Sequence, residues 1–183
     1  MQVRKLNTTD LYNSFITQTN KMNTNKITAM FSFAAMLLIA TATNAQVLTQ
    51  KNISLDAAKK VVSEAVKYAK ANNAPGGAIA VVDAGGNLVY LERLDGTFAA
   101  ASEVATKKAN TAALFKAPSS KLENSINGGR QALITVGHTF LQGGIPIIVD
   151  GQVIGAVGVS GSASAQQDED MANAGAKVKI DIP

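Results

Sequence analysis

The sequence has 183 residues, with 17 Lys and Arg against 13 Asp and Glu, one His and no Cys. This length suits one domain with a sizeable core. Four of the basic residues and one acidic residue lie in the first 45 positions, so the remainder carries 13 basic and 12 acidic residues. That balance predicts no surface for nucleic acid. The lack of Cys excludes disulfides, thiolate metal sites, a Cys nucleophile and covalently attached c-type haem.

An apolar run near the N-terminus predicts an export signal. The run, Ala29–Ala40, has 12 residues, whereas a membrane-spanning helix needs about 20. Lys21 and Lys26 precede it, and the small residues Thr43–Ala45 follow it. A basic start, a short apolar stretch and a small-residue exit are together typical of a cleavable secretory signal peptide. A buried helix of the fold is the alternative, and it is disfavoured because the run has no amphipathic period.

The predicted signal divides the chain into two parts. Residues 1–45 form an N-terminal extension with the signal peptide, and residues 46–183 form a single exported domain, in the periplasm or outside the cell. Residues 1–21 are polar and patternless. Counted from Met22 the leader has 24 residues, a usual signal length, so Met22 is our hypothesis for the translation start. No membrane-spanning segment is expected after cleavage.

The domain has the pattern of two β-hairpins and three main helices. The strands of the second hairpin flank Asp150-Gly151, a dipeptide that favours a tight type I′ turn. Residues 81–90 resemble residues 147–157, which predicts two similar hairpins adjacent in one sheet. The fold class is therefore α/β of the α+β type, a layered domain with a mainly antiparallel sheet flanked by helices. In chain order we expect a helix from Ser54 to Asn72, strands at 78–82 and 88–93, a helix at 102–116, a helical turn near 121–126, strands at 145–149 and 152–160, and a helix at 165–177.

Two glycine-rich patterns predict no catalytic or dinucleotide site. Residues Gly158–Ser162 resemble a nucleophile elbow around Ser160, but the last position holds Ser where that motif requires Gly. The glycines at 155, 158 and 161 lack the dinucleotide spacing and follow a hairpin instead of opening a βαβ unit. The segment keeps two weaker features of a ligand site. Its glycines let the backbone approach a ligand, and the N-terminus of the helix that follows favours an anion.

His138 is the only imidazole of the chain, so zinc ligands at metal spacing are absent. Haem iron needs only one axial donor, which His138, Tyr68, Tyr90 or Met171 could supply. A lone His is more often a surface residue or a hydrogen-bonded core residue than a ligand. Aromatic residues are few, which favours a shallow or intersubunit haem site; the five in the domain are Tyr68, Tyr90, Phe98, Phe115 and Phe140.

Three further segments can contact a small anion, and each has a plain structural alternative. Arg93 either clamps a carboxylate or pairs locally with Asp95. Lys108 either lies on a solvated helix face or points inward with the alanines of the same helix. Gly143–Pro146 either joins a loop to a strand or forms the rim of a pocket with exposed amides.

Seven motifs occur together in one order, and the ordered set resembles the haem-binding GlcG/HbpS family. The domain of that family is also found as the C-terminal part of PduO-type proteins. The resemblance covers about Leu48–Val178. The motifs are Ala80–Asp83 with Gly85-Gly86, Arg93–Gly96, Lys108–Ala112, Gly143–Pro146, Asp150-Gly151, Ile154–Gly161 and Gln167–Glu169.

This resemblance implies an antiparallel sheet flanked by helices, assembly into homo-oligomers, and non-covalent haem binding, with haem degradation proposed for some members. Leu94 departs mildly from the pattern, since Met is commoner there. No family ligand matches His138, so the axial donor stays open. At matching motif positions the resemblance implies ligand-binding roles for Arg93, Asp95, Lys108, Thr111, Gly144, Pro146, Ser160 and Asp168.

We therefore expect an exported homo-oligomeric protein that binds haem or another small anionic ligand, with His138 as the candidate metal ligand, and that sequesters or degrades haem. The alternative is an enzyme acting on a small carboxylate, in which Arg93 or Lys108 holds the anion and Asp95 or Asp168 moves protons. The sequence shows no paired-carboxylate or triad spacing for it. A third interpretation is a structural protein whose oligomer is its function.

Overall fold

The computed structural model describes residues 7–19 and 48–180, and the chain divides into two compact units, Met1–Thr49 and Gln50–Pro183. In the first unit it describes one exposed helix, α1 (Thr8–Thr19), with Asp10 in its first turn. The sequence predicts no helix within residues 1–21, and the one found has its acidic residue near the N-terminus, where a negative charge stabilises a helix. The predicted signal peptide lies outside the described residues. Among the described helices, none has the length and apolar character needed to cross a membrane.

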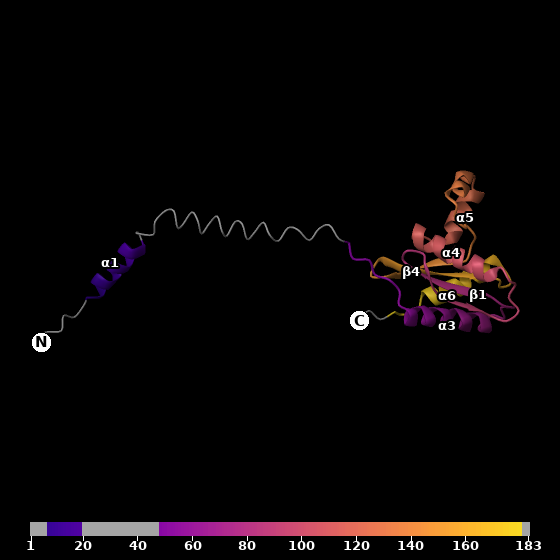
Figure 1. Cartoon of the computed structure of the whole chain (residues 1–183), viewed down its shortest axis with the longest axis horizontal. Coiled ribbons are helices and arrows are strands. Elements are labelled where there is room, and N and C mark those ends of the chain that lie inside the picture. Colours follow the sequence, from indigo (N-terminus) through magenta and orange to yellow (C-terminus); the bar gives the residue numbers. More distant parts are fainter. Residues whose placement is uncertain (1–6, 20–47, 181–183) are drawn as a thin grey trace. The chain divides into compact units, whose positions relative to one another are not determined.

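The second unit alternates helices and hairpins, as the sequence predicts (Figure 1). A type I′ turn requires a positive φ at both central residues, and Asp150 has φ +49° and Gly151 φ +74°. The elements are α3 (Leu55–Ala71), β1 (Ala78–Asp83), β2 (Leu88–Arg93), α4 (Ala101–Phe115), α5 (Ser119–Asn127), the 3-10 helix η1 (Gln131–Val136), β3 (Gly144–Val149), β4 (Gln152–Ser160) and α6 (Ala165–Ala176).

The two hairpins form one antiparallel sheet with strand order β2-β1-β4-β3. The inner strands β1 and β4 join the hairpins and run in register from Ala78 opposite Ser160 to Asp83 opposite Gly155. Helices α3 and α6 lie on one face of the sheet and α4 lies on the other (Figure 1). The expected α+β fold with a mainly antiparallel sheet is confirmed.

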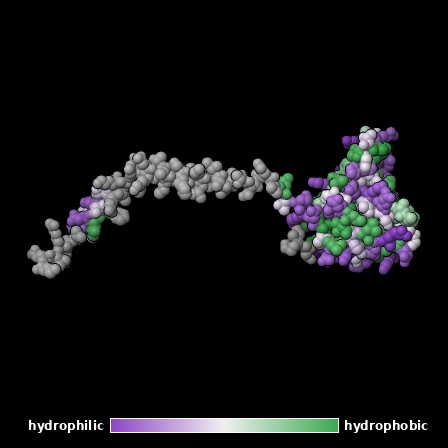
Figure 2. Space-filling view, viewed as in Figure 1, coloured by the Kyte–Doolittle hydropathy of each residue, from purple (hydrophilic) through white to green (hydrophobic). Residues whose placement is uncertain are grey.

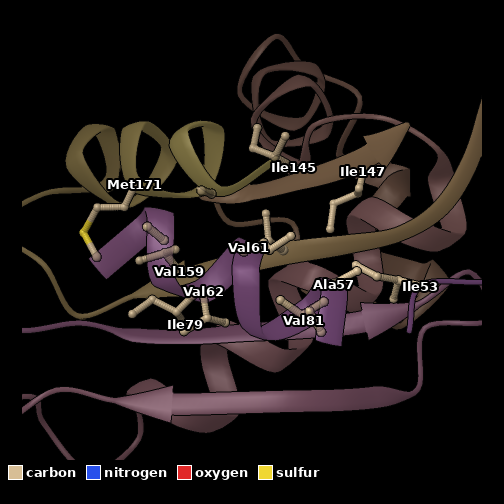
Figure 3. Packing of buried hydrophobic residues seen from close by; sticks show 14 of the residues in the cluster. Ile53, Ala57, Val61, Val62, Ile79, Val81, Ile145, Ile147, Val159 and Met171 are labelled. Atoms are coloured by element: carbon tan, nitrogen blue, oxygen red, sulfur yellow. The ribbon is translucent and has the colours of Figure 1, made fainter. Parts of the chain in front are cut away.

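The main core lies between the sheet and the α3–α6 layer (Figure 3). Helix α3 begins at Ser54, whose hydroxyl accepts a hydrogen bond from the amide of Ala57 at 3.2 Å. From there its apolar residues recur at helical spacing and point to the sheet. The largest side chains buried in this layer are Ile79, Val81, Ile147, Val157, Val159, Met171, Val61 and Val62.

The opposite face is packed with small residues, which bring α4 very close to the sheet. The buried alanines of α4, including Ala105 and Ala109, lie over Ala80 on β1 and over Ala156 and Gly158 on β4. A Cβ added at Gly158 would lie 2.1 Å from the carbonyl oxygen of Ala105. Only glycine permits this approach, because any side chain there would overlap the helix backbone.

The segment between α4 and β3 is more helical than expected. A helical turn was predicted near 121–126, and the structure has the nine-residue helix α5 there. The 3-10 helix η1 that follows it was not predicted. Only Ser119 of α5 is buried, and η1 has no buried residue. The sequence pattern missed these elements because few of their side chains face the core. In Figure 1, α5 rises away from the sheet. We call residues 119–136 the arm.

The close approach of α4 predicts the effect of a single methyl group. Gly158→Ala should lower the free energy of unfolding by about 1–3 kcal/mol, because α4 must move outward to admit the new Cβ. Urea denaturation followed by circular dichroism measures the change.

The matched control is Gly128→Ala at the end of α5, where φ is −77° and the nearest atom to an added Cβ is 3.2 Å away. It should change the free energy of unfolding by no more than about 0.5 kcal/mol. Equal losses in the two variants would contradict the close-packing argument.

Candidate functional site

The residues predicted to bind a ligand fall into three groups around α4. One group is a buried ion pair, the second anchors the loop before β3, and the third lies at the N-terminal end of α4. The groups are Lys108 with Asp168; Thr111 with Gly144 and Pro146; and Arg93, Asp95 and Ser160.

Lys108 and Asp168 form a buried ion pair between α4 and α6. The Lys108 Nζ lies 2.9 Å from Asp168 Oδ2 and donates a second hydrogen bond of 2.9 Å to the carbonyl oxygen of Val159. Asp168 Oδ1 accepts hydrogen bonds from the Ser162 amide at 3.0 Å and from its hydroxyl at 2.7 Å. The two side chains are only 5% and 8% exposed. Each charge is thus compensated inside the chain, and the pair ties α4, β4 and α6 together.

This pairing bears on the roles that were predicted for the two residues. Lys108 points inward, as one of its two interpretations held, and its ammonium is held by Asp168 and a carbonyl oxygen. Asp168 in turn accepts from three donor atoms. In this geometry neither group is free to hold an anion or to move a proton, so the pair positions the helices.

Thr111 and Ser119 fix the loop before β3. The buried hydroxyl of Thr111 donates to the carbonyl oxygen of Thr139 at 2.8 Å. The Ser119 hydroxyl donates to the carbonyl oxygen of Leu141 at 2.6 Å and accepts from the amide of Gly144 at 2.8 Å. Gly144 is required by space, because a Cβ there would lie 2.2 Å from the carbonyl oxygen of Lys108.

Pro146 completes this second group on the edge strand β3. It pairs with Ala156 on the α4 face and is half-buried. An edge strand suits proline, which has no amide hydrogen to donate to a ladder. The sequence offered no signal for the role of Ser119, since the two groups it joins are 22 and 25 residues away.

The anchored loop places His138 against two aromatic rings. Its ring centroid lies 5.4 Å from that of Phe115, with an interplanar angle of 85°, and 6.5 Å from that of Phe140. Phe115 and Phe140 also meet edge to face, at 5.6 Å. His138 is half-buried, and within residues 48–180 neither ring nitrogen makes a hydrogen bond. We call Phe115, His138 and Phe140 the aromatic cluster.

The surroundings of the aromatic cluster carry unpaired positive charge. Lys116 directly follows Phe115, and Lys121 and Arg130 lie on the arm; all three are exposed and make no ion pair with any described residue. The nearby carboxylate of Glu123 accepts a hydrogen bond from the Gln142 amide at 2.6 Å. Hydrophobic surface lies on the projection that carries α5 (Figure 2). The exposed apolar residues of this region are Leu114, Ile134, Val136 and Leu141.

These residues fit the chemistry of haem. A free imidazole nitrogen can coordinate iron, aromatic and aliphatic side chains can contact the macrocycle, and exposed cations can pair with propionates. Phe115 and His138 are half-buried and Phe140 is buried, so the described chain covers a flat ligand incompletely. A shallow site agrees with the small number of aromatic residues.

The third group lies at the other end of the sheet. Arg93 on β2 pairs with Ala78 on β1, and Ala78 pairs with Ser160 on β4, so the three form a row across the strands. Arg93 and Asp95 are exposed and make no ion pair with each other or with any other described residue. The local pairing of Arg93 with Asp95, one of the two predicted alternatives, is therefore not found. Ser160 is 4% exposed.

A family model described as haem degrading protein HbpS-like matches residues 53–177. The chain belongs to this HbpS-like family. The match spans α3 to α6, including the ion pair and the aromatic cluster. The predicted family is thus confirmed.

Individual relatives agree with this assignment. Protein GlcG of Escherichia coli K12 is 40% identical over 113 residues, which are 61% of this chain and 84% of GlcG. A double mutant of Streptomyces reticuli HbpS is 32% identical with a TM-score of 0.66, covering 74% of this chain and 92% of HbpS. The structure titled PduOC:Heme Complex is 27% identical with a TM-score of 0.60, covering 68% and 93%. Haem binding is thus supported at the level of the family.

Breaking the buried ion pair should cost far more free energy of unfolding than breaking an exposed ion pair of the same N···O distance. Lys108→Met should lower the free energy of unfolding by about 3–5 kcal/mol, because it leaves the Asp168 carboxylate buried without its cation. The control is Lys51→Met, which removes a 2.9 Å pair with Asp150 whose side chains are 39% and 66% exposed. It should cost about 0–1 kcal/mol.

Urea denaturation of Lys108→Met, Asp168→Asn and the double variant forms a thermodynamic cycle. The double variant should be more stable than the sum of the two single losses predicts, because each residue's removal relieves the other's uncompensated charge. Additive losses would contradict a direct interaction between the two side chains.

Proposed function

We propose that this chain binds haem non-covalently at the aromatic cluster, with His138 as the axial donor to iron. The observation that carries the proposal is the state of the His138 ring, which is held by Phe115 and Phe140 while both nitrogens lack a partner among the described residues. Coordination of iron needs one free ring nitrogen, and the other N–H of a metal-ligating histidine ordinarily donates to an acceptor, which no described residue supplies here. Bound haem supplies a redox-active iron, and the chain supplies its position.

The remaining parts of the site follow from charge and exposure. Lys116, Lys121 and Arg130 pair with the propionates, since Lys116 follows Phe115 directly and the other two are exposed cations of the arm without an ion pair to a described residue. Thr111 and Gly144 act as positioning residues, because they hold the loop that carries His138. Lys108 and Asp168 hold α4 in place beneath it.

Export and self-association belong to the same proposal. The apolar run Ala29–Ala40, flanked by Lys21 and Lys26, supports export by a cleavable signal. The exposed apolar residues of the arm, such as Ile134 and Val136, support a homo-oligomer in which a second copy covers the open side of the haem.

Hemin titration of the protein should give a saturable Soret shift at micromolar protein. His138→Ala should move the Soret maximum and weaken binding about tenfold or more, which corresponds to about 1.4 kcal/mol, because the iron loses its protein ligand. Phe98→Ala, an exposed aromatic at the other end of α4, is the control and should leave the spectrum unchanged. No saturable shift would end the proposal, and an unchanged spectrum in His138→Ala would remove His138 from it. Adding ascorbate to the loaded protein separates sequestration, with a constant spectrum, from degradation, with Soret loss.

If these cations contact the propionates, removing their charge should weaken hemin binding, whereas removing equal charge elsewhere should not. Neutralising Lys116, Lys121 and Arg130 together to Gln should weaken hemin binding about tenfold at low salt, because each exposed contact contributes up to about 1 kcal/mol. The Soret maximum should stay in place, since the axial donor is untouched. A triple change of Lys59, Lys60 and Lys70 to Gln on the exposed face of α3 removes the same charge elsewhere and should leave the affinity within about twofold. An equal loss in both triples would show a non-specific charge effect.

A further inference from the structure

The two edge strands of the sheet, β2 and β3, differ in whether a further strand can pair with them. On β3, Gly143 accepts a hydrogen bond from the amide of Val159, so the main-chain groups of Gly144 and Pro146 point outward. The Gly144 amide donates to the Ser119 hydroxyl at 2.8 Å, and Pro146 has no amide hydrogen. Both features oppose pairing with another chain, so the β3 edge is closed.

The outward main-chain groups of β2 have no such protection. The amide of Leu94 donates to the carbonyl oxygen of Gly77 at 3.0 Å, and the register with β1 continues from that pair. Bonded and outward residues alternate along an antiparallel strand, so the main-chain groups of Leu91 and Arg93 point away from β1. These groups make no hydrogen bond with any described residue. The β2 edge is therefore open.

The side chains on the α4 face of this edge include two apolar residues. Leu91 lies opposite Ala80 and packs beside the small residues under α4. Leu88 lies opposite Val82 and is 53% exposed. An open edge strand with uncovered apolar side chains is a template for a strand of another chain.

The sequence of β2 fits a second copy of itself in one antiparallel register. With Leu91 opposite its equivalent, the outward main-chain groups of the two strands meet and can form up to about six hydrogen bonds. Tyr90 then lies opposite Glu92 of the second copy, and Arg93 lies opposite Val89. No like charges oppose each other, and the two Leu91 side chains meet on the α4 face.

The neighbouring registers are less favourable, because like charges directly opposite each other destabilise a strand pair. A register centred on Glu92 opposes two carboxylates, and one centred on Arg93 opposes two guanidinium groups. A register centred on Tyr90 moves Arg93 beyond Leu88, where β2 begins. The charges of the strand thus give a second copy a defined position.

We propose that β2 pairs antiparallel with β2 of a second copy of this chain, about a two-fold axis at Leu91, so that two four-stranded sheets join into one eight-stranded sheet. About a two-fold axis each copy presents the same surface to the other, so the contact closes at a dimer. The pairing also removes an open edge that is otherwise available for aggregation.

This contact uses a surface other than the one in the haem proposal. His138 and the arm precede β3, which is the opposite edge strand of the sheet. The β2 pairing consequently does not rest on haem binding.

A single-cysteine crosslink tests the register, since the chain has no Cys of its own. Leu91→Cys should give a disulfide-linked dimer under mild oxidation. The reason is that Cα atoms of a hydrogen-bonded antiparallel pair lie about 5.5 Å apart, within the disulfide range of about 4.4–6.8 Å. Arg93→Cys is the matched control on the same face, and Arg93 is exposed. Its two copies would be about 14 Å apart along the strands, so it should stay monomeric on a non-reducing gel.

Light scattering of the full chain at about 100 μM measures the association, because a contact of this size is expected to bind in the micromolar range. Leu91→Lys should lower the average mass to about half, since a lysine on an edge strand opposes pairing. Ile148→Lys places the same charge on an exposed residue of β3 and should leave the mass unchanged. Circular dichroism melts show that each variant is folded, and Leu91→Lys should bind hemin as the wild type does.

Three results would overturn the β2 pairing. These are a monomeric wild-type chain at that concentration, a folded Leu91→Lys variant that keeps the wild-type mass, and an Arg93→Cys variant that crosslinks as readily as Leu91→Cys. The hemin titration is an independent measurement, so failure of the pairing leaves the haem proposal standing, and failure of the haem proposal leaves the pairing standing.

Discussion

The structure depends on the buried contact between Lys108 and Asp168. An ammonium and a carboxylate placed inside a protein are costly unless each compensates the other. Here they meet at 2.9 Å, and the remaining hydrogen bonds go to Val159 and Ser162. Moving α4 away from β4 or α6 would uncover a charge. The pair therefore fixes α4, which covers one face of the sheet in the described part of the chain.

The small residues beneath α4 let the helix pack closely against the sheet, which further restricts its position. Alanines of the helix lie on alanines and glycines of β1 and β4, so the helix backbone comes close to the sheet. A closely held helix cannot rotate or slide without overlap. Its two ends are consequently defined positions, which is a requirement for any site built on them.

The proposed haem site uses the C-terminal end of α4. At the C-terminal end, Phe115 orients His138, and Thr111 holds the loop that carries it. This end suits a flat amphiphilic ligand with negatively charged substituents. A chain without Cys has no thioether to attach haem, so haem at this end would be held non-covalently.

The sequence by itself determined the α+β class, both hairpins, their adjacency and the family, because hydrophobic period, Asp-Gly turn chemistry and ordered motifs are local properties. It also singled out Lys108, Asp168, Ser160 and His138. Only the tertiary structure decided that the first two bind each other and that His138 meets Phe115 and Phe140. The arm was missed because its exposed side chains leave little hydrophobic pattern. The sequence pattern could not show the ion pair because Lys108 and Asp168 are 60 residues apart along the chain. Only the packing of the helices on the sheet brings them together.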